Sequence, residues 1–472
     1  MKFSHLAALF ASSSGVSASW LATRDDSDGS DGGTRLPYPS KDPWMKSAPD
    51  GWNTSSPGTV LKVRPHAYNM SASAVKFDGY RDVFQLMFRS TDSHDQPMYG
   101  VTTVFVPQTS SAVKANWTAS IPVLSYHPPY DTACIDASPG YGLQFGEPYG
   151  EIALALKRGW FVSVPDYEGP KASYGANVLA GHVMLDAARA VVSTLGHGVP
   201  TTTEELPARF INSTATITKS NVTLAFWGYS SGATATNFAL ELADTYAPDL
   251  FIKGAVVGGM TANLTRSCEL LSGRDVAGLL AQTLLGMTTQ YPDQQRLLND
   301  SLWPSGVYNA TEFRSARYMT GWQSLVHFAY QNMFSYFREG RTSVFGSVPL
   351  QTMLAREGWA GRHGSPPTRT RTFYYQAVGD EMCPSEYVDT LVNTFCSNRT
   401  TSAAGKSGEL FLYQRNLVGG HNDELSNGRQ RALDFVGEVL DGTATALTAG
   451  LPATGCVMQN VTVSVNPNGP FH

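Results

Sequence analysis

The stretch AFWGYSSGA, residues 225–233, decides the fold that we expect for this chain, because it places Ser230 between Gly228 and Gly232. An apolar, strand-like run (222–227) comes before this turn, and residues of helical composition follow it. A serine on such a sharp strand-to-helix turn exposes its hydroxyl above the sheet, and the turn needs small residues two positions to either side. The pattern predicts a nucleophile elbow with Ser230 as the nucleophile. The alternative is a tight turn that only needs glycines.

Other apolar runs are spaced like the strands of a parallel sheet, with helical stretches such as 181–195 and 233–246 between them. This alternation predicts an α/β fold with a mostly parallel sheet and helices on both faces. A block at 82–106 alternates apolar and polar residues, which indicates an antiparallel hairpin. The runs expected to form parallel strands are 121–126, 160–164, 222–227, 252–257, 372–378 and 410–414.

One interval, 261–367, breaks this rhythm because it contains no convincing strand, while 275–287 and 311–337 look helical. A crossover between parallel strands needs only one helix, so this length predicts an inserted helical cap on a core formed by 59–260 and 368–472. Its aromatic side chains could line an acyl pocket, but we favour the interpretation that most of them form the cap's own core. They are Trp322, Phe328, Tyr330, Phe334 and Phe337.

The N-terminus and the sequons indicate a secreted, extracellular protein. Residues 1–18 carry Lys2, an apolar stretch and a small-residue cleavage signal, which is typical of a secretory signal peptide. Residues 19–58 include a run rich in Asp, Ser and Gly, and we expect them to be disordered or extended. Asn-x-Ser/Thr sequons, which are candidate glycosylation sites, occur at Asn53, Asn69, Asn116, Asn212, Asn221, Asn263, Asn299, Asn309, Asn398 and Asn460.

The composition narrows the possible partners. Hydrophobic residues make up 42% of the chain, enough for a substantial core. A net charge of −5 with 15% charged residues provides no basic surface, so nucleic acid is not an expected partner. After the N-terminal stretch, no run of about 20 apolar residues predicts a transmembrane segment. We expect a monomer.

The serine needs a histidine to remove its proton, and in this fold the order along the chain is serine, acid, histidine. His421 follows the 410–414 strand through a Gly-Gly pair and is the predicted base. Of the other histidines after the serine, His327 lies in a helical aromatic stripe, His363 lies in a linker, and His472 ends the chain.

The acid should lie at the end of a strand before the histidine. The 372–378 strand leads directly into Asp380, which is the predicted acid, with Glu381 as its neighbouring competitor. Asp423 and Glu424 are too close in sequence to His421 to be preferred.

The tetrahedral intermediate of acyl transfer needs backbone N–H donors, known as an oxyanion hole. One donor should be the amide of Ser231, directly after the nucleophile. The second should come from a loop after an earlier strand, either 127–131 or 165–169. The first loop contains two prolines, which have no N–H to donate, so Asp166 in the second loop is preferred.

Taken together, these residues resemble the fungal secretory lipase family, the lipase A type of α/β-hydrolase. The resemblance implies a secreted carboxylic ester hydrolase with a helical cap, no metal and no cofactor. It also implies Ser230, Asp380 and His421 as the catalytic triad and the amides of Asp166 and Ser231 as the oxyanion hole. It rests on Tyr126, Asp131, Cys134, PDYEGP at 165–170, LDAARA at 185–190, WGYS at 227–230, YAPDL at 246–250, Gly258, Gly259, GDE at 379–381 and His421.

The five cysteines allow up to two disulfides and one remaining thiol in an oxidising compartment, and spacing alone does not decide the pairing. The resemblance implies the pairs Cys134–Cys268 and Cys396–Cys456. Cys383 is then left over, and we interpret it as a small buried hydrophobe and not as a second nucleophile.

The first candidate substrate is a triacylglycerol or another fatty acyl ester, reached at a lipid–water interface. The alternative keeps the same residues but makes the protein a small-ester deacetylase, or an acyltransferase, for a fungal secondary metabolite such as a trichothecene-type acetyl ester. A non-catalytic binding module on the same scaffold is disfavoured, because the serine, the acid and the histidine all occur in order. The sequence contains no H-E-x-x-H pair and no phosphate-binding G-x-x-x-x-G-K-[ST] motif.

Overall fold

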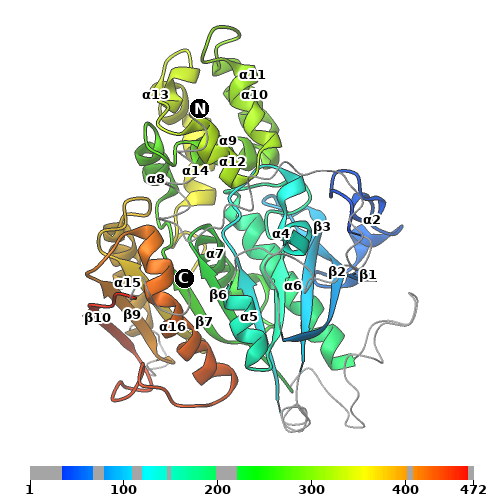
Figure 1. Cartoon of the computed structure of the whole chain (residues 1–472), viewed down its shortest axis with the longest axis vertical. Helices are drawn as coiled ribbons and strands as arrows, with labels where there is room; N and C mark the ends of the chain where they lie inside the picture. The colour runs from blue at the N-terminus through cyan, green and yellow to red at the C-terminus, as the bar shows by residue number, and fades with distance from the viewer. Residues whose placement is uncertain are drawn as a thin grey trace.

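A ten-stranded, mostly parallel sheet forms the centre of the protein (Figure 1). The computed structural model describes residues 35–66, 79–108, 120–145, 150–197, 221–400 and 408–465. The order across the sheet is β1-β2-β3-β5-β4-β6-β7-β8-β9-β10. The strands are β1 (Val60–Pro65), β2 (Tyr80–Thr91), β3 (Pro97–Pro107), β4 (Ile121–His127), β5 (Phe161–Pro165), β6 (Val222–Tyr229), β7 (Ile252–Gly258), β8 (Arg371–Ala377), β9 (Phe411–Asn416) and β10 (Cys456–Val461).

The predicted α/β-hydrolase fold is confirmed, and so are its six expected parallel strands and its antiparallel hairpin. Strands β4 to β10 run parallel to their neighbours, whereas β1, β2 and β3 are antiparallel, and β3 joins the parallel part by pairing antiparallel to β5. The two edge strands, β1 and β10, had no clear signal in the sequence. Both are only partly buried, so their side chains lack the apolar run that marks a central strand.

Helices cover both faces of the sheet, as expected. Helices α6 (Asn177–His197), α7 (Ser231–Tyr246) and α15 (Ser385–Thr400) pack on one face, in a cluster that contains Val183, Phe238 and Phe395. Helices α5 (Gly150–Lys157) and α16 (His421–Leu440) pack on the other face, with Ile152 and Phe435. Among the described helices, α6 is long and apolar enough to span a membrane, but 83% of its most apolar window is buried inside the fold, as in a core helix.

Between β7 and β8 the chain forms a layer of short helices that stands at the top of Figure 1, beyond the end of the sheet. We call residues 261–367, the range predicted as an insertion, the cap. It has its own apolar cluster, which includes Leu284, Phe313 and Tyr336. Its helices are α8 (Leu264–Leu271), α9 (Gly278–Met287), η8 (Thr288–Gln290), α10 (Pro292–Ser301), α11 (Ala310–Ser315), η9 (Ala316–Tyr318), α12 (Gly321–Phe328), η10 (Met333–Tyr336), α13 (Arg341–Phe345) and α14 (Val348–Gly358).

The stretch 311–337 is not one helix but several short helices. Thr320 begins α12 with a capping box that includes Gln323, and Tyr330 has a positive φ of 61°, which interrupts the helical path. Of the aromatic residues expected here, Phe328 and Phe337 are buried in the cap's cluster and Phe334 packs against it. Tyr330 is 64% exposed.

The N-terminal expectation of a disordered or extended segment over 19–58 is wrong for its second half. Residues 35–58 form α2 (Pro43–Lys46) and the 3-10 turn η2 (Trp52–Thr54). Asp42 caps α2 and accepts a hydrogen bond from Arg64 on β1, and the Arg64 guanidinium lies over the ring of Trp44. The Asp-, Ser- and Gly-rich composition that motivated the prediction ends before these aromatic and charged residues.

The remaining short helices are η4 (Ile135–Ala137), α4 (Pro139–Gly142) and η5 (Leu143–Phe145), all between β4 and α5. The predicted signal peptide (1–18) and the sequons at Asn69, Asn116 and Asn212 lie outside the described residues.

One of the two implied disulfides is present. Cys396 on α15 is bonded to Cys456 at the start of β10, with a Cα–Cα distance of 5.8 Å. The implied bond between Cys134 and Cys268 is not formed in the structure. Cys268 lies in the cap's apolar cluster, where burial raises the pKa of its thiol to about 12 and keeps it protonated.

Candidate active site

Ser230 lies at the turn between β6 and α7, with φ 55° and ψ −124°. A positive φ is strained for a residue with a side chain, and such strain is typical of functional turns. The Ser230 N–H donates to the carbonyl of Gly258 on β7, and the Ser230 carbonyl accepts from the N–H of Thr234. Backbone hydrogen bonds on both sides therefore hold the strained residue at the carboxyl end of the sheet.

The two glycines of the motif are required by close packing as well as by the turn. A Cβ on Gly232 would lie 1.9 Å from the carbonyl oxygen of His127 at the end of β4. A Cβ on Gly228 would lie 2.4 Å from the carbonyl oxygen of Gly232. No side chain fits at either place, so the glycines allow β4 and α7 to approach the serine from two sides.

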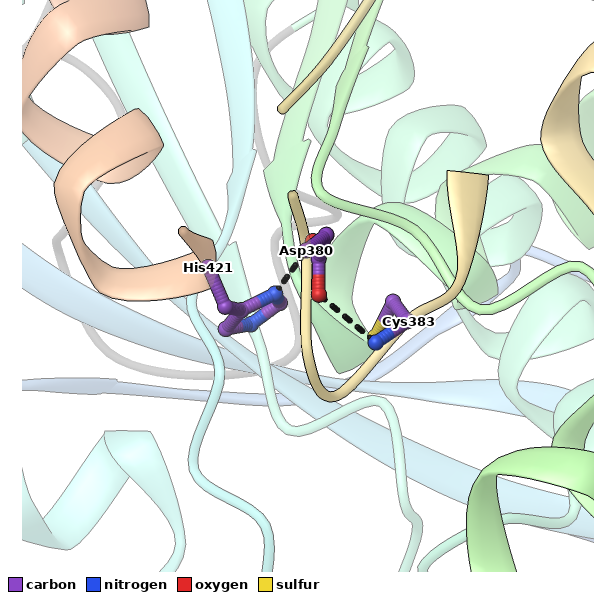
Figure 2. Close-up of side chains that lie close together, drawn as sticks. All are labelled: Asp380, Cys383 and His421. Carbon is purple, nitrogen blue, oxygen red and sulfur yellow. Dashed lines mark hydrogen bonds and ion pairs between the residues drawn. The ribbon is translucent and has the colours of Figure 1, made fainter. Parts of the chain in front are cut away.

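The three residues predicted as a triad meet at this turn. Nε2 of His421 lies 2.9 Å from Oγ of Ser230, and its Nδ1 lies 2.7 Å from Oδ2 of Asp380. Asp380 follows β8, and His421 is the first residue of α16, so both come from the carboxyl ends of neighbouring strands. The side chain of His421 points at Asp380 (Figure 2). The two side chains are 4% and 0% exposed, so water is largely excluded from the pair.

Asp380 is fixed by three donors. Its Oδ1 accepts from the N–H groups of Cys383 (2.7 Å) and Met382 (3.0 Å), and its Oδ2 accepts from Nε2 of Gln376 (2.8 Å). Burial alone would lower the pKa of His421, but the Asp380 carboxylate together with Cys383 outweighs burial and holds that pKa well above 6.5. The carboxylate therefore orients the imidazole and also makes it a stronger base.

The competing residues take other places. Oε2 of Glu381 accepts from the backbone N–H of His421, and Asp423 accepts from the N–H of Gly420, so both support the turn before α16. His327 pairs with Glu312 on the cap, and His363 contacts the carbonyl of Arg356. Neither histidine approaches Ser230.

The preference for Asp166 as an oxyanion donor is wrong. Its N–H donates to the carbonyl of Val101 (2.9 Å), which continues the pairing of β5 with β3, so it is not available to a substrate. Its carboxylate also points elsewhere, since Oδ1 accepts from the N–H of Gly140. In the other loop Pro128 and Pro129 do lack an N–H, but Asp131, two positions further on, has one.

The loop after β4 is the one that reaches the serine. Asp131 has a positive φ of 47° and lines the same cavity as Ser230 and Ser231. Among the hydrogen bonds of the described residues, none occupies the backbone N–H of Asp131 or of Ser231. The second predicted donor, Ser231, therefore remains a candidate, and Asp131 replaces Asp166 beside it.

Three carboxyl groups lie in or near this loop: those of Asp166 and Glu168 are buried, and that of Asp131 is partly buried. Burial raises the pKa of Asp131, of Asp166 (to about 7) and of Glu168. Burial therefore disfavours the charged forms of these groups, which would repel an oxyanion.

A cavity of about 40 Å³ opens beside Ser230. Cap and core both contribute to its walls, and none of the five aromatic residues considered as possible lining of an acyl pocket is among them. The lining residues other than Asp131, Ser230 and Ser231 are Tyr174, Gly175, Asn177, Thr234, Thr261, Leu264, Ser267, Leu271, Leu279, Thr283, Met382 and Cys383.

Cys383 lies beside the Asp380–His421 pair (Figure 2). It is 5% exposed, burial raises the pKa of its thiol, and its Sγ lies 2.8 Å from Oγ1 of Thr261. Ligand atoms of Asp380, Cys383 and His421 lie within 4.8 Å of one another, a spacing that a metal ion can require. However, the 2.7 Å between Nδ1 and Oδ2 is a hydrogen bond, whereas two tetrahedral zinc ligands would be roughly 3.4 Å apart. The geometry fits a hydrogen-bonded pair better than a metal site.

Solved structures of other proteins are similar to this one. The structure of Candida antarctica lipase A is similar with a TM-score of 0.71 at 23% identity, over 92% of this chain and 91% of that one. An esterase, LipA, from Xanthomonas oryzae is similar with a TM-score of 0.59 at 14% identity, over 83% of this chain and all of that one. At these identities the likeness supports the α/β-hydrolase fold alone.

Sequence comparison identifies closer relatives. A trichothecene C-3 esterase from Fusarium sporotrichioides is 37% identical over 431 residues, which cover 90% of this chain and 88% of that protein. Lipase 1 from Candida albicans is 32% identical, over 84% of this chain and 80% of that protein. Residues 148–447 match the model of the secretory lipase family. The chain therefore belongs to the secretory lipase family, a group of lipases and esterases that hydrolyse carboxylic esters.

Proposed function

We propose that this protein is a serine hydrolase of short-chain carboxylic esters, with Ser230 as nucleophile, His421 as general base and Asp380 as the orienting acid. The observation that carries the proposal is the continuous path from Ser230 Oγ through the imidazole to Asp380, with steps of 2.9 and 2.7 Å, at a strained elbow. Both steps lie within the reach that proton transfer requires.

In the proposed reaction, Ser230 Oγ attacks the ester carbonyl while His421 Nε2 takes the hydroxyl proton. The carbonyl oxygen becomes an oxyanion, which the backbone N–H groups of Asp131 and Ser231 stabilise. His421 then gives its proton to the leaving alcohol, and an acyl-enzyme remains on Ser230. Water, activated by the same histidine, attacks the acyl group and restores the serine.

The cavity beside Ser230 supports a short acyl group. One water molecule needs at least about 10–15 Å³ by this measure, so 40 Å³ accommodates roughly three waters or one acetyl group. Leu264, Leu271 and Leu279 of the cap form apolar walls that a long acyl chain would have to displace. We therefore favour the second of the two substrate classes, a small ester of a secondary-metabolite alcohol, over a triacylglycerol.

The relatives support the same choice. One is named a trichothecene C-3 esterase, and a second, from Stachybotrys chartarum, is named a probable trichothecene esterase and is 30% identical over 90% of this chain. Lipases of Candida albicans are 28–32% identical, so a fatty acyl ester remains the second candidate. An acyl ester of a trichothecene-type alcohol is thus the proposed natural substrate.

We further propose that the protein is secreted and glycosylated. The family is described as secretory, and the Cys396–Cys456 disulfide suits an oxidising compartment. Of the sequons in the described residues, Asn53, Asn398 and Asn460 are exposed, while Asn221, Asn263, Asn299 and Asn309 are partly buried. The three exposed asparagines are the first candidates for glycans.

The test is hydrolysis of p-nitrophenyl esters from acetate to palmitate, and of a trichothecene acylated at C-3, by the purified protein. We expect acetate and butyrate to be the best p-nitrophenyl substrates and Ser230→Ala to remove nearly all activity. Ser163→Ala is the matched control, because Ser163 is a buried serine on β5 that bonds to Thr102 and does not line this cavity. A rate that rises up to palmitate would support the lipase alternative, and full activity in Ser230→Ala would overturn the proposed nucleophile.

A further inference from the structure

The loop that carries Asp131 is attached to the cap immediately after that residue. Oγ1 of Thr132 donates to the carbonyl of Met319 (2.8 Å), and the N–H of Ala133 donates to Oε1 of Gln282 (2.7 Å). Met319 follows η9 and Gln282 lies on α9, so both acceptors belong to the cap. The next two residues after Asp131 are therefore held by the cap and not by the sheet.

The side chain of Gln282 connects the cap to the loop through hydrogen bonds at both ends of its amide. Its side chain is completely buried, and its Nε2 donates to the carbonyls of Ala316 (3.0 Å) and Met319 (3.3 Å). The amide thus uses both N–H groups within the cap and directs its oxygen at the N–H of Ala133. Since a buried polar group without a partner is costly, these bonds fix the orientation of the amide and with it the position of the loop.

The backbone of the cap also packs against the same loop. A Cβ on Gly321, the first residue of α12, would lie 3.0 Å from the carbonyl oxygens of both Tyr130 and Asp131. This approach is tighter than side chains normally permit, so α12 abuts the peptide groups on either side of Asp131. Movement of this part of the cap would change the space available to the loop.

The other end of the loop is held by the core. The hydroxyl of Tyr167 donates to the carbonyl of Pro128 (2.8 Å), and the hydroxyl of Tyr130 accepts from the N–H of Glu168 (2.8 Å). The rings of Tyr130 and Tyr167 are in contact, edge to face, at 4.9 Å between centroids. The segment after β5 thus fixes where the loop begins, and Gln282 fixes where it ends.

We propose that Gln282 of the cap is a positioning residue for the oxyanion hole, so that the cap completes the catalytic site instead of only covering it. This inference rests on the proposed function, in which the Asp131 N–H stabilises the oxyanion. A donor must lie within a narrow distance of the oxyanion, and a misplacement of about 1 Å can cost about a hundredfold in rate. Ala133 lies one residue after Thr132 and two after Asp131. If it lost its bond to Gln282, the Asp131 N–H could therefore shift by such a distance.

The test is Gln282→Met, which keeps the size of the side chain and removes its hydrogen bonds. We expect kcat for p-nitrophenyl acetate to fall about ten- to a hundredfold with little change in KM, because the oxyanion exists only after the substrate is bound. Gln290→Met is the matched control. Gln290 is also a buried cap glutamine that bonds to the core, through Nε2 to Oγ of Ser173, but it does not touch the Asp131 loop. We expect it to keep wild-type kcat.

A second measurement separates positioning from stability. A trifluoromethyl ketone adds to Ser230 Oγ and forms a tetrahedral oxyanion, so its inhibition constant should rise in Gln282→Met in parallel with the loss of kcat. Thr132→Val, which removes the bond to Met319, provides a second variant if Gln282→Met does not fold, and should change both constants in the same direction. Equal kcat and equal inhibition in the Gln282 and Gln290 variants would overturn the proposal. Failure of the proposed function itself would be seen separately, as activity in Ser230→Ala.

Discussion

Two backbone turns meet at Ser230 and are held in different ways. The elbow, residues 228–232, is fixed inside the α/β core by glycines that allow direct backbone contact and by the strand bond from Ser230 to Gly258. The oxyanion loop, residues 128–132, contains no glycine. Hydrogen bonds from this loop and from Ala133 to the segment after β5 and to the cap hold it in place.

This difference separates a local constraint from a tertiary one. The residues that form the elbow, one serine and two glycines, lie within five consecutive positions, so a short motif identifies it even though its contacts reach His127 and Gly258. The residues that hold the oxyanion loop come from near positions 167, 282 and 319, and no short motif contains them. We expect substitutions that add volume to disturb the elbow most, and substitutions that remove one hydrogen bond to disturb the loop most. The following predictions test this contrast.

The largest effect should come from Asp380→Asn, which changes the partner of His421 and leaves both turns in place. We expect kcat to fall by about 10⁴, because an amide does not hold the imidazole in the required tautomer. His421 works as a base only when it is neutral, and Asp380 holds its pKa above 6.5, so wild-type activity should be lost as pH falls through that raised pKa. Without the carboxylate the pKa drops, so the residual activity of the variant should persist to lower pH.

These expectations are checked by pH profiles of kcat/KM for both proteins. Glu381→Gln is the control, because the Glu381 carboxylate bonds to the backbone N–H of His421 and not to its imidazole, and the variant should leave the acidic limb near its wild-type position. An acidic limb that stays unchanged in Asp380→Asn would contradict the assignment of Asp380.

The elbow should be most sensitive to volume. In Gly232→Ala the new methyl group would lie 1.9 Å from the His127 carbonyl oxygen, a backbone atom that cannot rotate away. We expect the free energy of unfolding to fall by about 3 kcal/mol or more, together with most of the activity. Gly150→Ala is the control, because Gly150 is exposed and has no atom within 4 Å of the added methyl group. Wild-type stability of Gly232→Ala in a urea titration would show that the elbow is not held by this contact.

The oxyanion loop should be sensitive to one hydroxyl group. Tyr167→Phe removes the bond to the Pro128 carbonyl and leaves that buried acceptor without its donor. We expect a loss of about 1 kcal/mol in stability and about tenfold in kcat, with KM nearly unchanged. Tyr374→Phe loses an equally buried bond, to Asn237, far from the loop, and should lose stability without losing kcat. Parallel behaviour of the two variants in kcat would indicate that the loop is held by packing alone.

The same contrast explains which parts of the site the sequence predicts. Ser230 was predicted because it follows a strand directly between two glycines, His421 because it follows a strand through a Gly-Gly pair, and Asp380 because it comes just after the strand that precedes His421's strand. The six central strands were found because burial on both faces leaves a continuous apolar run. Each of these signals lies within a few consecutive residues.

Asp131 was missed because its assignment depends on strand order. β5 lies between β3 and β4 in the sheet, so the N–H of Asp166 continues the ladder to Val101 and cannot face the serine. No short stretch of sequence specifies that order of strands in the sheet. A weak signal did exist, since aspartate tolerates a positive φ better than most residues, and Asp131 follows the strand that ends next to the elbow. The sequence also did not show that the stretch 311–337 divides into separate helices near Thr320. The strongly apolar pattern of this stretch conceals its capping residues.

The smallest effect should come from Cys383→Ala, although Cys383, unlike Gln282 or Tyr167, bonds directly to a residue of the triad. Its contribution to Asp380 is a backbone N–H, which alanine keeps, and its thiol is protonated because burial raises its pKa. We therefore expect kcat to stay within about threefold of wild type and iodoacetamide to leave wild-type activity intact. Rapid inactivation by iodoacetamide that Cys383→Ala prevents would mean that the thiol is reactive after all. The segment after β8, which carries Asp380 and Cys383, would then depend on a single side chain as strongly as the oxyanion loop does.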